Sequence, residues 1–258
     1  MASSSPAFSS KAIFVATLVA IGAAGCGFDA AAAGPESLRE GLFGPRPSEG
    51  RRMMAPPVGR YVSEEGQAFI LDRSTPNPLL KFENSPEVWA LQPHPAPRGD
   101  VIYKNDLGEP VLRATRLGGL TIFTNERPGG SAAALAGGSP PLRLPPLGPQ
   151  ALLERLAQAS ARASRAARRL IPFEADATPA SAPLVADAAM IAAEAVAQIA
   201  RRADARALLA RFKKVRLVEG RKPSAVVQKG VMQITVTPAD GLAGRPSSER
   251  IVAAADKR

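Results

Sequence analysis

The chain has 258 residues, with 33 Lys and Arg against 23 Asp and Glu, one cysteine and one histidine. A single cysteine excludes an intramolecular disulfide and a cysteine-based zinc site, and a single histidine leaves few routes to Ser-His-Asp catalysis. Residues 148–258 hold +9 of the net charge of +10. A basic surface of this kind favours polyanions as partners.

Residues 1–33 have the pattern of an export signal. Lys11 precedes a 13-residue apolar run at residues 12–24, which fits a signal-peptide core and is shorter than the roughly 20 residues of a spanning helix. Two processing routes stay open. Cys26 is lipidated after the lipoprotein-like box at residues 23–26, or ordinary cleavage near residues 30–33 removes it; an uncleaved short anchor is the third alternative. We therefore expect a periplasmic protein, or one tethered to the outer membrane through Cys26.

Residues 34–57 combine Gly, Pro and charge, and we expect them to form a flexible leader. A single domain is predicted over residues 58–251, with a β-rich part at 58–127 and a tail at 252–258. The segment from residue 240 is rich in Gly, Pro and Ser and then charged, and its end is expected to fray.

The β-rich part contains short apolar runs that flank polar, turn-sized clusters. The pattern predicts an antiparallel meander, open or curled towards a barrel. Gly108 is expected to supply the positive φ of one hairpin turn. The three prolines of residues 92–100 favour an exposed connection. The predicted strands are 60–62, 67–71, 79–82, 88–91, 101–103, 110–114 and 120–124.

The second half of the chain has helical periodicity. Residues 129–148 are predicted as a loop that leads into a helix from about Pro149 to Leu170, and a second helix is predicted from Leu184 to Phe212. Strands are expected at 213–238, with a turn at Lys229-Gly230. The predicted fold class is α+β: a meander, either open or barrel-like and completed by the C-terminal strands, packs against a helical hairpin over residues 149–212.

No catalytic constellation is evident. His94 lies between two prolines without a rigid partner to orient its ring. A hydrolase could use Ser131, or the carboxylates of Asp100 and Glu109. The acidic turn at residues 104–109 lacks the spacing of a calcium loop, and the glycines before Ser131 lack that of a phosphate-binding loop, so no metal or cofactor is predicted.

Charged residues of the loops between residues 98 and 131 are the candidate ligand-binding set, because turn geometry explains the glycines and asparagines but not the charges. These residues are Arg98, Asp100, Asp106, Glu109, Arg113, Arg116 and Arg127, and the uncharged Ser131 is included with them.

A basic face is predicted on the first helix, where Arg155, Arg162, Arg165 and Arg169 share one stripe. Two alternatives remain: these arginines pair with carboxylates of the sheet, or they meet an anionic partner such as a lipid headgroup. No nucleic acid is expected as a partner of an exported protein.

The segments RGDVIYKNDLGEPVLRATRLGGLTIFT, RPGGSAA, LLERLAQASARASRAARRL and GLAGRPSSERI resemble a family of secreted alphaproteobacterial proteins known only as a domain of unknown function. The resemblance covers roughly Tyr61 to Ile251 and leaves the leader outside. It implies an extracytoplasmic protein, without an established activity or cofactor.

The sequence therefore predicts a non-catalytic binding or structural module of the bacterial envelope. Its expected partner is an envelope protein or an anionic ligand, bound through the loops of residues 100–130 and the basic face. The alternative is the hydrolase described above.

Overall fold

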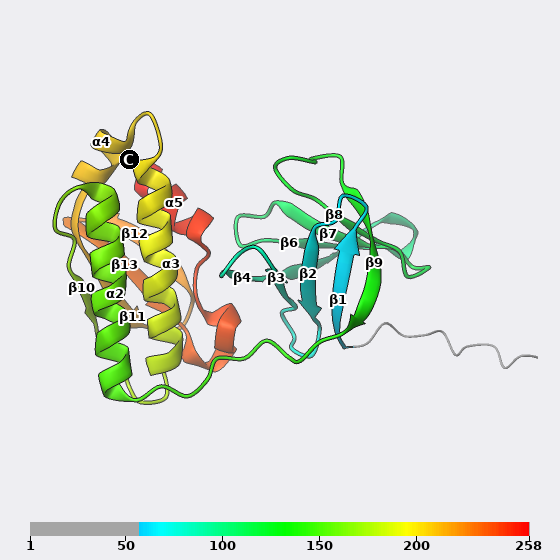
Figure 1. Ribbon diagram of the computed structural model, residues 1–258, viewed down its shortest axis with the longest axis horizontal. Coiled ribbons are helices and arrows are strands. Elements are labelled where there is room, and N and C mark those ends of the chain that lie inside the picture. The colour runs from blue at the N-terminus through cyan, green and yellow to red at the C-terminus, as the bar shows by residue number, and fades with distance from the viewer. Residues whose placement is uncertain (1–56, 258) are drawn as a thin grey trace, which may run out of the picture. The chain divides into compact units, whose positions relative to one another are not determined.

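The computed structural model describes residues 57–257, which fall within one compact unit. The predicted signal segment, Cys26 and the leader to residue 56 lie outside these residues. The predicted α+β class is confirmed: an antiparallel meander is joined to a second, smaller sheet with helices packed on it (Figure 1).

Nine strands form the meander, which curls into a nearly closed barrel. The order is β4-β3-β2-β1-β9-β8-β7-β6-β5. The two edge strands, β4 and β5, are consecutive in the chain and are joined through the buried Leu91. The strands are β1 (Val58–Ser63), β2 (Ala68–Asp72), β3 (Leu79–Phe82), β4 (Val88–Ala90), β5 (Gln92–Pro95), β6 (Val101–Lys104), β7 (Pro110–Ala114), β8 (Leu120–Ile122) and β9 (Ser131–Gly138).

Two segments of the meander differ from the sequence-based prediction. Residues 131–138, expected to be loop, form β9, which pairs with both β1 and β8. Residues 92–95, expected to be an unpaired connection, form the exposed strand β5 against β6. Pro93 and Pro95 keep β5 at the edge, because proline has no N–H to give to a further strand.

The interior of the meander contains a row of aromatic contacts. Tyr61 stacks on Phe69 with ring centroids 5.6 Å apart, and Phe69 meets Phe82 at 6.1 Å. Phe82 in turn meets Trp89 edge to face at 5.9 Å. Such arrangements are favoured by the charge distribution of the rings. Trp89 lies at the end of this row, on the edge strand β4, and it lines the site described below.

The C-terminal strands form a sheet of their own and do not complete the meander as predicted. This sheet has the order β10-β11-β13-β12, from β10 (Phe173–Ala175), β11 (Phe212–Glu219), β12 (Ser224–Gln228) and β13 (Gly230–Val236). The predicted turn is present: Lys229 and Gly230 both have positive φ, as a two-residue hairpin loop requires.

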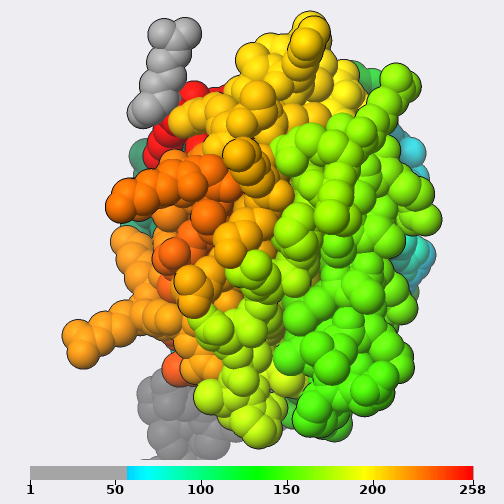
Figure 2. Space-filling model, turned by 90° about the vertical axis from the view of Figure 1, so that its left-hand side faces the viewer, coloured from blue at the N-terminus to red at the C-terminus, as the bar shows by residue number. Residues whose placement is uncertain are grey.

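Three longer helices and a short one accompany the small sheet. They are α2 (Pro149–Ala167), α3 (Ala182–Ala200), α4 (Ala205–Ala210) and α5 (Ser248–Asp256), and 3₁₀ turns lie at η1 (Pro97–Gly99) and η2 (Pro238–Gly244). α2 forms much of the surface that Figure 2 turns towards the viewer. The end of the chain, expected to fray, instead belongs to α5, which extends to Asp256 and buries Ile251 and Ala255 in the core of this half.

α2 and α3 pack together but are not joined as a hairpin, because β10 returns the chain between them (Figure 1). Arg169 lies two residues after the C-terminal end of α2. Its guanidinium donates to the carbonyls of Leu209 and Phe212, close to the start of β11. Thr178, just before α3, bonds Glu219 at the other end of β11. The two helices therefore run in the same direction. The predicted second helix also breaks after Ala200, and the chain turns before α4.

α3 is the core helix of this half. Its length and its mean hydropathy of 1.4 would also suit a membrane span, but most of its residues are buried against α2, α5 and the small sheet.

Candidate functional site

The β6–β7 turn of the meander meets the first turn of α5. Ser247 caps α5 by accepting the Arg250 amide, and it donates its own amide and hydroxyl to Asp106 at 2.9 and 2.7 Å. Ser248 donates its amide and hydroxyl to Glu87 at 2.8 and 2.5 Å. Carboxylates are stabilised at a helix N-terminus by its free amides and dipole. Two acidic residues of the meander thus hold α5 in place.

Asn105 organises the β6–β7 turn and is only 4% exposed. Its Oδ1 accepts the amides of Leu107 and Glu109 at 3.1 and 2.9 Å, and Gly108 takes the predicted positive φ. Its Nδ2 donates to Oε2 of both Glu109 and Glu249, each at 3.1 Å. One carboxamide therefore joins a carboxylate of the hairpin to a carboxylate of α5.

The Glu109 and Glu249 pair carries uncompensated negative charge. Burial raises the pKa of Glu249, and the charges of Glu109, Glu87 and Asp106 raise it further. Arginines lie 3.8 Å from Glu87 and 3.9 Å from Asp106. Within residues 57–257, by contrast, neither Glu109 nor Glu249 forms an ion pair with Lys or Arg.

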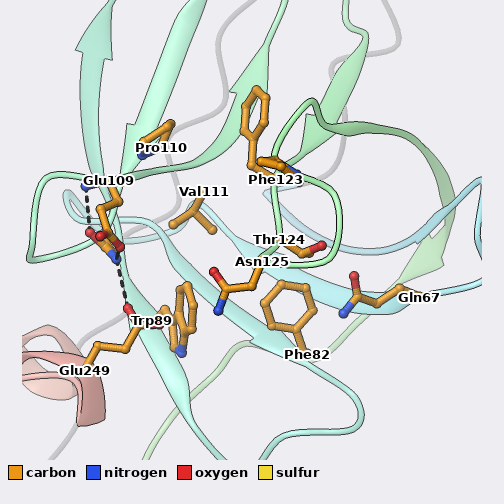
Figure 3. Close-up of a pocket in the computed structure, with 12 residues that line it drawn as sticks. Gln67, Phe82, Trp89, Glu109, Pro110, Val111, Phe123, Thr124, Asn125 and Glu249 are labelled. Atoms are coloured by element: carbon orange, nitrogen blue, oxygen red, sulfur yellow. Dashed lines mark hydrogen bonds between the residues drawn. The ribbon is translucent and has the colours of Figure 1, made fainter. Parts of the chain in front are cut away.

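A pocket of about 440 Å³ opens beside this pair (Figure 3). Its apolar wall combines Phe82, Trp89, Val111 and Phe123, and Asn125 points towards Trp89. Trp89 is the only tryptophan of the chain. The other lining residues are Gln67, Asn105, Glu109, Pro110, Thr124, Pro128 and Glu249, so the lining includes two carboxylates and no Lys or Arg.

The loop of residues 123–130 forms one side of the pocket. Thr124 and Arg127 exchange backbone hydrogen bonds, and the Arg127 guanidinium lies 3.0 Å from Glu65 in the β1–β2 turn. Gly130 has a φ of 85°, and a Cβ there would lie 2.5 Å from Thr121 and 2.8 Å from the Phe123 ring. The loop geometry therefore requires glycine at this position.

Arg245 fixes the other side of the junction and is 4% exposed. It donates Nε to Asp187 on α3 and Nη2 to the Val88 carbonyl at 3.1 Å, and it faces Glu87. The guanidinium carries its N–H donors on three separate nitrogens, so it can reach partners that lie on different sides of it. A second hollow of about 410 Å³ lies here, with both acidic and basic groups in its lining.

The eight predicted ligand-binding residues do not form one site. Asp100 is buried and bonds the guanidinium of Arg113, which lowers the pKa of Asp100, and it accepts the Arg116 amide at 3.2 Å. Arg98 belongs to the η1 turn beside them. Only Glu109 lines the pocket, while Asp106 holds α5 and Arg127 anchors the pocket loop.

The residues proposed for a hydrolase are not brought together. Asp100 precedes β6 and Glu109 precedes β7, at opposite ends of the paired strands. Ser131 is buried at the start of β9, and its hydroxyl has no hydrogen-bond partner within residues 57–257. His94 is exposed on β5, with β8, β7 and β6 between it and β9.

The basic face of α2 does not pair with carboxylates of the sheet. Arg162 pairs with Glu194 on α3, and Arg169 bonds main-chain carbonyls and lies 5.8 Å from the Phe212 ring centroid. Arg155 and Arg165 are exposed, and no ion pair involves them in the described residues. In the same part of the chain, no group of three His, Cys, Asp or Glu side chains is placed to hold a metal ion.

The family model for the domain of unknown function DUF4908 matches residues 37–255, which is most of the chain. The chain belongs to the DUF4908 family. The match begins before Tyr61 and so includes most of the leader that the resemblance had left outside. Searches of curated proteins and of solved structures found no match.

Sequence patterns did not single out four residues of the candidate site in this DUF4908 protein, namely Glu87, Trp89, Arg245 and Glu249. Ser247 followed by Glu249 is a helix-start signal, because a capping serine is commonly followed by acidic residues in the first turn. That signal predicts α5, but not what the helix packs against. The contact between Asn105 and Glu249 spans 144 positions of the chain.

Proposed function

We propose that this DUF4908 protein is a non-catalytic binding module, whose ligand binds in the pocket bounded by Trp89, Phe123 and Glu249. The observation that carries the proposal is the composition of this pocket: three aromatic rings and a small number of positioned polar groups around a concave space. Small-molecule sites have this composition, because the apolar wall supplies affinity and the polar groups fix orientation.

The envelope location is part of the proposal and rests on the N-terminal sequence alone. The apolar run at residues 12–24 after Lys11 supports export. A lipid on Cys26 would place the binding domain at a membrane surface, and the intact mass of the protein from the membrane fraction tests this.

A hydrolase remains the second candidate, now with Glu109 and Glu249 as its residues. The observation in its favour is that two carboxylates share one carboxamide while the pKa of Glu249 is raised, as in many acid-base pairs. The binding proposal expects every bound ligand to be recovered unchanged; turnover that Glu249→Gln abolishes would favour the hydrolase.

The indole N–H signal of Trp89 in a nitrogen-15 NMR spectrum tests the binding proposal, because no other tryptophan contributes. We expect a screen of small aromatic and aliphatic fragments to shift this signal. The comparison variant is Asn125→Phe, at an exposed position in the pocket loop. The larger phenylalanine side chain should occupy the pocket and reduce the response. If no fragment shifts the signal, or if Asn125→Phe responds as strongly as the wild type, the proposal fails.

A further inference from the structure

We infer that the ligand of this pocket is an organic cation, an ammonium or guanidinium group on an apolar stem. The inference rests on the proposed function and adds the chemical class of the ligand. It departs from the sequence-based expectation of an anionic partner, because the charge at the pocket has the opposite sign to the net charge of the chain.

The local charge is the first reason. The chain carries a net charge of +10, yet the pocket lining includes Glu109 and Glu249 and neither Lys nor Arg. Two arginines next to lining residues in the sequence are already engaged: Arg127 pairs with Glu65, and Arg250 lies 3.9 Å from Asp106. A carboxylate pair in a partly buried wall attracts an external cation and disfavours an anion.

The free acceptor atoms are the second reason. Asn105 Nδ2 occupies Oε2 of both Glu109 and Glu249. Among the described residues, no hydrogen bond reaches Oε1 of either carboxylate. An N–H-rich cation can therefore donate to both carboxylates without displacing an existing bond, and charge-assisted hydrogen bonds of this kind are the strong ones.

The aromatic wall is the third reason. Phe82 and Trp89 meet edge to face, and Phe123 is a further aromatic residue in the pocket lining. Ring faces attract cations through their quadrupole and also accept an apolar stem. These two properties together select a cation with an apolar body over a small inorganic cation.

Three probes of similar size separate the ligand classes: benzylamine, benzyl alcohol and benzoate, which differ in charge. We expect titration of the full chain, monitored by Trp89 fluorescence and by calorimetry, to show benzylamine binding at least tenfold more tightly than benzyl alcohol, with no binding of benzoate. Glu109→Gln combined with Glu249→Gln should abolish this preference. Glu154→Gln, an exposed site on α2, is the matched control and should retain it.

Equal binding of benzylamine and benzyl alcohol, or a preference that survives both substitutions, would overturn the cation inference while leaving the pocket as a binding site. Absence of any response to benzylamine would also overturn it. If the double variant unfolds, the single variant Glu109→Gln is tested in its place and should weaken the preference for benzylamine. Glu109 is exposed and does not contact the serines that cap α5. The proposed function itself fails if the fragment screen leaves the Trp89 signal unchanged, or if Asn125→Phe responds as strongly as the wild type.

Discussion

Glu87 accepts both the amide and the hydroxyl of Ser248, at 2.8 and 2.5 Å, and both side chains are almost fully buried. The same relationship between Asp106 and Ser247 lies one residue earlier on α5. Glu249 follows directly, so its position in the pocket wall depends on these two contacts. The pocket wall therefore includes the Glu249 carboxylate only while α5 is docked on the meander.

Ser248→Ala should lower the free energy of unfolding by about 1–3 kcal/mol, because it leaves the buried Glu87 with an unsatisfied carboxylate oxygen. Ser131→Ala is the matched control, since Ser131 is equally buried but its hydroxyl has no partner in the described residues. Removing that hydroxyl should leave stability unchanged or higher. Urea unfolding measures both. Equal losses for the two variants would mean that the Glu87 contact contributes nothing.

Arg245→Met should destabilise the protein by about 3–5 kcal/mol, because it removes the cation that Asp187 and the buried Glu87 share. Arg216→Met removes an exposed pair with Asp176 and should cost less than about 1 kcal/mol. Chemical denaturation of the two variants provides the comparison. A loss below about 1 kcal/mol for Arg245→Met would show that the junction does not depend on it.

Stability should fall as pH rises above 4.5, the usual pKa of glutamate, because burial and neighbouring carboxylates raise the pKa of Glu249 and burial raises that of Glu87. A carboxyl with a raised pKa in the folded state binds more protons when folded, so its contribution is lost with rising pH. Asp100 has a lowered pKa through Arg113 and acts in the opposite sense, losing its contribution as pH falls through and below 3.8.

Glu249→Gln should flatten the decrease above pH 4.5, whereas Glu154→Gln should not alter it. Thermal unfolding midpoints measured across pH 4 to 8 in each variant test this expectation. An unchanged pH profile in Glu249→Gln would contradict the assigned cause.

Gly130→Ala should destabilise the protein by about 2 kcal/mol and weaken ligand binding, because the new Cβ meets Thr121 and displaces the Phe123 wall of the pocket. The neighbouring Gly129→Ala is the control: nothing lies within 4 Å of its Cβ position and its φ is not positive. Denaturation and fragment binding to Trp89 would be measured in both. Similar behaviour of the two variants would refute the steric explanation.

Local signals predicted much of the fold. The hairpin turn at Gly108, the turn at Lys229-Gly230 and the helix start at Pro149 all depend on residues adjacent in sequence, and each is present. β9 was missed because its alanines and glycines have little preference for strands. It is a strand because β1 and β8 offer hydrogen-bonding partners on both sides.

The pocket could be predicted only in fragments. Asn105 has the signature of a turn residue, and its Oδ1 serves that role. The second role of Asn105, holding Glu249, arises only when α5 docks on the meander. Periodicity and turn chemistry are local, so they could not place Trp89, Glu109 and Glu249 around one space.

A crystal structure of the protein with benzylamine is the most direct test of the pocket as the binding site. We predict the benzyl ring against Trp89 and the ammonium nitrogen within hydrogen-bonding distance of both Glu109 and Glu249. An empty pocket at saturating benzylamine, or benzylamine bound only elsewhere on the protein, would contradict this prediction.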